Sequence, residues 1–82
     1  VDFVSYGSAG LFAFEIKRSS SIRSEELESL KLFQRDYPTA RCFLLYGGNE
    51  SRRVDGIEIR NFEKALWELP AIFGVSLPVK AD

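Results

Sequence analysis

The segment Arg41–Tyr46 constrains the fold most, because after its arginine it is an unbroken apolar run. A strand with apolar side chains on both sides has to be covered on both faces, as in the middle of an α/β sheet. Residues 24–36 precede it with a helical pattern, in which Leu27, Leu30 and Phe33 form one apolar stripe. A helix between two strands crosses over to a parallel strand with right-handed connection. The sequence therefore predicts an α/β domain with a central parallel strand.

Two strands before the helix form a predicted antiparallel hairpin. Val1–Tyr6 and Leu11–Lys17 flank residues 7–10, which are a short glycine-bounded turn. The simplest register closes this turn and places Asp2 opposite Glu15. Like charges about 5 Å apart on one face destabilise a sheet unless a cation lies between them. The end of the hairpin is therefore a candidate cation site.

This predicted site suits a divalent metal with oxygen ligands. Lys17 points to the same face as Glu15, because side chains alternate along a strand. Mg²⁺ prefers one or two carboxylates, several waters and a substrate phosphate. Asp2 and Glu15 are therefore candidate metal ligands, and Lys17 is a candidate catalytic residue that orients a water or stabilises developing negative charge. The alternative is an ordinary solvated hairpin face, in which Lys17 neutralises one of the carboxylates.

The C-terminal half predicts an edge strand and a short helix. Val54–Arg60 alternates apolar and charged residues, as a half-exposed edge strand would. Asn61 is the candidate cap of a final helix that Pro70 would end. The apolar residues on the expected buried side of this helix are Phe62, Ala65, Leu66 and Leu69. The expected organisation is one domain in residues 1–70 and a C-terminal tail in residues 71–82.

Composition excludes several classes of function. A net charge of −1 and a pI near 5.4 argue against nucleic-acid binding by bulk charge, so any contact with DNA has to be local. The absence of histidine removes histidine-based catalytic triads and histidine zinc sites. The single cysteine, Cys42, lies in an apolar run, which favours a buried thiol in a reducing interior. No apolar stretch approaches the roughly 20 residues of a membrane helix, so we expect a cytoplasmic protein without a membrane partner.

Residues 1–4, a glycine turn and residues 12–20 together resemble the core of the PD-(D/E)XK nuclease superfamily. More narrowly, the chain resembles the nuclease-like domain at the C-terminus of many prokaryotic AAA+-type ATPases, through residues 37–41, 44–48 and 62–69 as well. The resemblance implies a restriction-endonuclease-like core with a mixed sheet. It also implies that the acidic side chains of Asp2 and Glu15 bind metal, while Lys17 assists hydrolysis of a phosphodiester.

The resemblance carries further expectations. The superfamily core usually begins with a helix and another strand, so we expect the chain to be truncated at its N-terminus. The RecB-like branch carries a glutamine and a tyrosine on the following helix, where Gln34 and Tyr37 are the candidates. Tyr37 could instead close the helix against the core. Arg18, Ser19 and Arg23 lie in a serine-rich connection and are candidate phosphate contacts, unless the connection is only a solvated loop that leads to a cap at Ser24.

Three functions remain open for the parent protein. The first is Mg²⁺-dependent hydrolysis of DNA by a C-terminal nuclease-like module, with an ATPase module in the same chain. The second is a noncatalytic nuclease fold that docks to DNA, to the ATPase module or to a protein partner. The third is a plain structural module with an incidental acidic pair. We expect the isolated fragment to be inactive, because an incomplete ligand set binds Mg²⁺ weakly.

Overall fold

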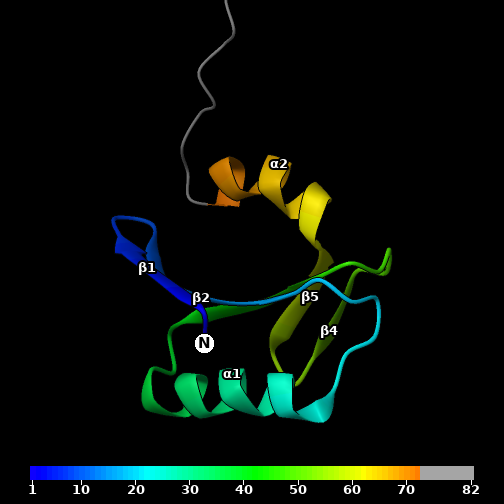
Figure 1. Ribbon diagram of the computed structural model, residues 1–82. Helices are drawn as coiled ribbons and strands as arrows, with labels where there is room; N and C mark the ends of the chain where they lie inside the picture. The colour runs from blue at the N-terminus through cyan, green and yellow to red at the C-terminus, as the bar shows by residue number, and fades with distance from the viewer. Residues whose placement is uncertain (73–82) are drawn as a thin grey trace, which may run out of the picture.

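The computed structural model describes residues 1–72 as a mixed five-stranded sheet with one helix on each face (Figure 1). The strands are β1 (Phe3–Gly7), β2 (Gly10–Lys17), β3 (Arg41–Tyr46), β4 (Arg52–Val54) and β5 (Ile57–Asn61), and the helices are α1 (Ser24–Asp36) and α2 (Phe62–Ile72). The strand order β1-β2-β3-β5-β4 puts β3 in the centre. Strands β2, β3 and β5 are parallel, and β1 and β4 are the antiparallel edges. The predicted α/β class and central parallel strand are confirmed.

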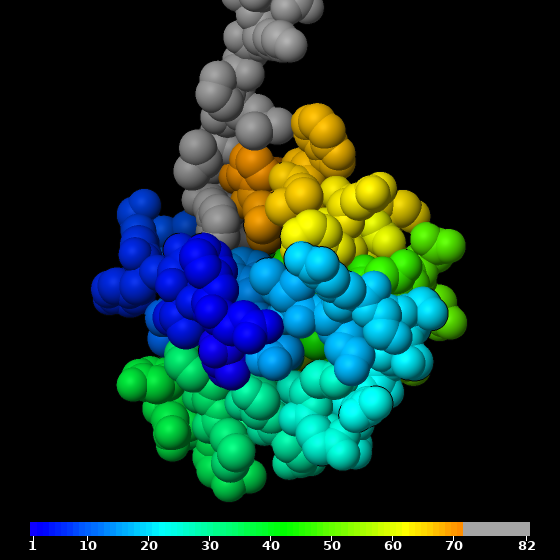
Figure 2. All heavy atoms as spheres, viewed as in Figure 1, coloured from blue at the N-terminus to red at the C-terminus, as the bar shows by residue number. Residues whose placement is uncertain are grey.

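The β1–β2 hairpin has the predicted register over its paired residues. Tyr6 pairs with Leu11, and the pairing continues to Phe3 and Phe14. There the regular ladder stops, because the amide of Asp2 donates to the carbonyl of Phe14 (2.9 Å). In Figure 2 the first residues of the chain (dark blue) lie against helix α1.

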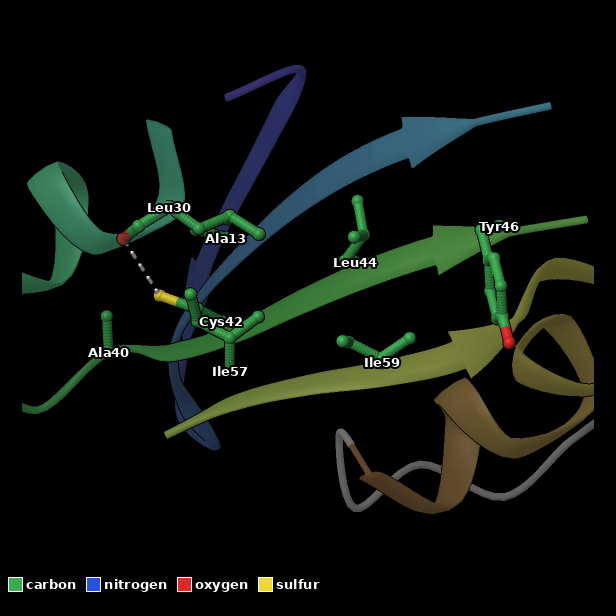
Figure 3. Close-up of a cluster of buried hydrophobic side chains, with 8 residues drawn as sticks. All are labelled: Ala13, Leu30, Ala40, Cys42, Leu44, Tyr46, Ile57 and Ile59. Atoms are coloured by element: carbon green, nitrogen blue, oxygen red, sulfur yellow. Dashed lines mark hydrogen bonds between the residues drawn. The ribbon is translucent and has the colours of Figure 1, made fainter. Parts of the chain in front are cut away.

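Helix α1 covers one face of the sheet, as its apolar stripe predicts. The buried cluster on this face comprises Ala13, Leu30, Ala40, Cys42, Leu44, Tyr46, Ile57 and Ile59 (Figure 3). Leu27 and Phe33 of α1 pack against it. The Cys42 thiol donates to the carbonyl of Leu30 (3.9 Å), and burial raises the pKa of this thiol. The cysteine is therefore a buried free thiol, as predicted.

Helix α2 covers the opposite face. Its cluster contains Phe12, Phe14, Phe43, Leu45 and Ala65, with Phe62 and Leu69 packed against it. Leu66 was expected on the buried side but is half exposed, because Phe62, Ala65 and Leu69 form the side of the helix that contacts the sheet. Asn61 is confirmed as the cap, since its Oδ1 accepts the amide of Lys64 (3.0 Å).

The predicted edge strand Val54–Arg60 is wrong in position. The structure divides this region into β4 and β5, joined by a turn at Asp55 and Gly56. Both turn residues have positive φ, 51° and 82°, which is the conformation of a two-residue type I′ hairpin turn. β5 then lies between β3 and β4, so Ile57 and Ile59 are fully buried.

Two predicted helix ends also differ. Pro70 lies inside α2, which continues to Ile72, because a proline near the end of a helix removes only one amide donor. The tail predicted for residues 71–82 therefore starts inside the helix, and residues 73–82 lie outside the described part. At α1 the cap is Arg23, and Ser24 is already helical. Within residues 1–72 neither helix is long and apolar enough to cross a bilayer.

Candidate functional site

Asp2 lies at the open end of the hairpin, beside β2. Its Oδ2 accepts a hydrogen bond from the amide of Ile16 (2.8 Å). Strand amides point along the plane of the sheet, so this carboxylate replaces a ladder acceptor at the edge of β2. The expected pairing directly opposite Glu15 is therefore corrected. Asp2 and Glu15 still share one end of the hairpin, which we call, together with Lys17, the acidic corner.

Glu15 is the partly buried member of the acidic corner. Its Oε1 is shielded from solvent and has no hydrogen-bond partner among the described residues. The ammonium of Val1, which donates a hydrogen bond to Ser29 Oγ of α1 (2.8 Å), lies 3.1 Å from this oxygen and forms an ion pair with it. The positive charge belongs to a free amino terminus, and a residue before Val1 would remove it. Without that ammonium the shielded oxygen would lack a counter-charge, so another cation would stabilise this environment.

Lys17 faces helix α1, where its partner is an acid that the sequence did not assign to the site. Its Nζ donates to Glu26 Oε1 (2.7 Å). The other oxygen of Glu26 accepts the amide of Arg23 (2.6 Å) and so caps the helix. The hydrogen bond from Lys17 lowers the pKa of Glu26. The alternative in which Lys17 neutralises Asp2 or Glu15 is therefore wrong. The sequence signal for this contact was Glu26 at the third position of α1, where an acidic side chain caps the helix near the end of β2.

The candidate phosphate contacts lie on the connection between β2 and α1. Arg18 is exposed and has no ion-pair partner within residues 1–72. The Oγ of Ser19 accepts the amide of Ser21 (3.0 Å), which closes a local turn. Arg23 is the cap of α1, and its exposed side chain has no ion-pair partner within residues 1–72 either. Arg18 and Arg23 therefore both offer cations, and Arg18 directly follows Lys17, the last residue of β2.

Gln34 and Tyr37 lie at the other end of α1. Gln34 Nε2 donates to a backbone carbonyl of the following turn (3.5 Å). Tyr37 ends the helix through its amide, and its ring packs on Phe33 at 4.8 Å. Lys17 contacts the first turn of α1, so about 12 Å of helix separates Glu26 from Gln34. The structure does not bring this pair to the acidic corner. Tyr37 ends the helix as the structural alternative predicted, but its side chain is half exposed and does not enter the core.

A hollow of about 730 Å³ lies where the three parallel strands end. Lys17 and Arg18 border it after β2, and Asn61 and Phe62 border it after β5. The carboxyl ends of parallel strands are where open α/β sheets bind ligands. A Cβ on Gly47 would clash with the carbonyl oxygen of Arg18, so this glycine permits close backbone approach. The hollow adjoins the acidic corner, because Lys17 belongs to both.

Residues 1–65 match the family described as Domain of unknown function (DUF4143). The chain belongs to this family. No curated protein and no solved structure matches the chain. The matched region of this DUF4143 domain includes the acidic corner and every candidate site residue discussed above.

The sequence analysis did not predict a second polar cluster in the DUF4143 domain. Glu58 is buried on β5, on the α2 side of the sheet. Arg41 and Arg60 bind its carboxylate at 2.8 and 2.7 Å, and Arg53 lies 3.8 Å away. The sequence signal for this cluster was Glu58 itself, a charged residue between two isoleucines. A carboxylate that is buried is almost always paired, so Glu58 would need cationic partners. The partners were not predictable while β4 and β5 were treated as one strand.

The acidic corner offers few protein ligands. Among residues 1–72, no group of three or more histidine, cysteine or acidic side chains could hold a metal ion. Two carboxylates are nevertheless within the range that Mg²⁺ uses when waters and a substrate phosphate complete its shell. The shielded Oε1 of Glu15, which has no hydrogen-bond partner among the described residues, fits such an ion. These two carboxylates are a smaller donor set than a metal site built from protein ligands alone would need.

Proposed function

We propose that this DUF4143 domain is a nuclease-like module with a restriction-endonuclease-like core. In the parent protein it would support Mg²⁺-dependent hydrolysis of DNA phosphodiesters, beside an ATPase module of the same cytoplasmic chain. The observation that carries the proposal is Glu15, whose shielded Oε1 has no hydrogen-bond partner among the described residues. That oxygen lies at the same end of the hairpin as the carboxylate of Asp2.

The residues of the acidic corner have separate roles in this proposal. Asp2 and Glu15 would hold Mg²⁺, which when bound supplies Lewis-acid stabilisation of phosphate charge and a more acidic water. The amide of Ile16 fixes the carboxylate of Asp2. Glu26 holds the ammonium of Lys17 at 2.7 Å, which fixes its position next to the corner. That ammonium stabilises negative charge that develops on the phosphate.

The hollow at the ends of the parallel strands would take the substrate backbone. Lys17 belongs to both the acidic corner and the hollow, so a phosphate at that end of the hollow would lie beside the acidic corner. Arg18 adds an exposed guanidinium without an ion-pair partner in the described part of the chain. These two cations supply the local contact that an acidic chain needs to bind DNA.

The test is DNA cleavage by the full-length protein that carries this domain, with Mg²⁺ or with EDTA. We expect Glu15→Gln to lower metal-dependent cleavage about 100-fold, because it removes a ligand charge and keeps the side-chain shape. Glu25→Gln is the matched control, since Glu25 is an exposed acid in the first turn of α1. Cleavage by Glu15→Gln at the rate of the unmodified protein would refute the proposal.

A noncatalytic docking module is the second candidate. Two observations favour it: Lys17 is already occupied by Glu26, and the described residues hold no third acidic ligand at the corner. In this case the fold would serve to dock to DNA, to the ATPase module or to a protein partner. The same assay separates the two, because a docking module shows no metal-dependent cleavage even with Glu15 intact.

A further inference from the structure

Glu58 organises a surface on the α2 side of the sheet, far along the strand order from the acidic corner. Its side chain is 8% exposed. Arg41 of β3 contributes two donors to it, at 2.8 and 3.3 Å, and Arg60 of β5 contributes one at 2.7 Å. Two guanidinium groups thus satisfy this carboxylate. Any further arginine nearby is in excess of what Glu58 needs.

The same contacts fix the orientation of the two guanidinium groups. Arg41 lies 5.2 Å from the centre of the Phe43 ring, and Arg60 lies 5.8 Å from it. A second acid, Glu68 of α2, holds the other end of Arg60 at 2.9 Å. A planar guanidinium held on a ring and a carboxylate loses little freedom when it binds another anion. Glu58 therefore acts as a positioning residue for the arginines.

One further arginine extends this set on the same face. Arg53 has a 68% exposed side chain and lies 3.8 Å from Glu58, too far for a strong hydrogen bond. Its neighbour Arg52 is opposite Ile59 of the α1-side cluster, so strand alternation places Arg52 on the other face. We call Arg41, Arg53 and Arg60, with Glu58, the arginine surface.

The arginine surface carries net positive charge in an acidic chain. Three arginines face two carboxylates, those of Glu58 and Glu68, which leaves an excess of one positive charge. The whole chain has a net charge of −1. The surface is also concave, with a hollow of about 410 Å³ between β4, β5 and Glu68 that Arg52 and Arg53 border. A local anion site is thus built into a chain with no bulk attraction for anions.

We propose that the arginine surface binds the phosphate backbone of a nucleic-acid strand. Its arginines come from three adjacent strands, β3, β5 and β4, so they form a row about 10 Å long across the sheet. A row of this length exceeds one phosphate and matches a ligand with repeated charges. The surface lies on the face opposite Glu15, and it needs no metal. It therefore goes beyond the proposed hydrolysis, and either can fail without the other.

The test is fluorescence anisotropy of a labelled oligonucleotide with the full chain, in EDTA and at several salt concentrations. The variant is Arg53→Gln, because its side chain is exposed and its loss leaves Glu58 paired with Arg41 and Arg60. We expect its affinity to fall about threefold and the slope of log K against log salt to drop by about 1. Arg35→Gln, which removes an exposed charge from α1, is the control and should bind normally.

Two other probes identify the anion. Inorganic phosphate should compete only weakly, because it cannot span the row. A polyglutamate peptide should bind less tightly than the oligonucleotide. Unchanged affinity and salt slope in Arg53→Gln would overturn the proposal, as would no binding of the oligonucleotide. Preferential binding of polyglutamate that depends on Arg53 would overturn the nucleic-acid assignment in favour of an acidic protein segment.

Discussion

Phe43→Ala is expected to lower the free energy of unfolding by about 3 to 5 kcal/mol. Phe43 is fully buried in the central strand, and its ring stacks on Phe14 at 5.2 Å and on Phe12 at 6.4 Å. Its removal leaves a cavity under α2 and takes away the ring beneath two guanidinium groups. A domain of this size has a total stability of about 5 to 10 kcal/mol, so this loss is a large part of it.

Urea denaturation followed by circular dichroism measures this effect. Phe43→Leu is the control, because it keeps most of the buried volume and should cost less than about 1.5 kcal/mol. A urea midpoint for Phe43→Ala equal to that of the unmodified protein would show that the aromatic cluster does not hold the two layers together.

Glu58→Gln is expected to lower the free energy of unfolding by about 2 kcal/mol at neutral pH. The change keeps the side-chain shape but removes the charge, so Arg41 and Arg60 lose their shared counter-charge. The cost is below that of a fully buried ion pair, since these guanidinium groups are 44% and 28% exposed. Both can therefore recover part of their solvation from water.

The pH dependence of stability gives this prediction a second readout. Burial would raise the pKa of Glu58, but hydrogen bonds from Arg41 and Arg60 outweigh it and lower the pKa below 4.5. A carboxylate with a lower pKa in the folded state stabilises the fold above its unfolded pKa. That contribution is lost as the pH falls through the folded value. Urea midpoints between neutral and acidic pH should therefore fall less steeply in Glu58→Gln, and parallel curves would contradict the role of this cluster.

The parts of the fold that the sequence predicted are those with local signals. A glycine-bounded turn sets the hairpin register of β1 and β2, and an apolar run identifies β3. The turn at Asp55 and Gly56 was also a local signal, but the alternation of residues 54–60 concealed it. Treating the region as one strand placed β5 at the edge and hid the neighbours of Glu58.

The candidate site was less predictable, because its contacts depend on elements distant in sequence. The alternation along β2 correctly puts Glu15 and Lys17 on one face. The alternation does not predict that α1 brings Glu26 to Lys17. Strand pairing does not predict that the carboxylate of Asp2 replaces a backbone acceptor for the amide of Ile16. Such choices between side-chain and backbone partners leave no pattern in the sequence.

The most direct test of the metal site is a titration of Mg²⁺ into ¹⁵N-labelled protein, followed by amide NMR shifts. The account predicts shifts confined to Asp2, Ile16, Lys17 and their neighbours, which saturate at millimolar metal and disappear in Glu15→Gln. Glu25→Gln should behave as the unmodified protein. No shift at millimolar Mg²⁺, or the same shifts in Glu15→Gln, would contradict a metal site built on Glu15.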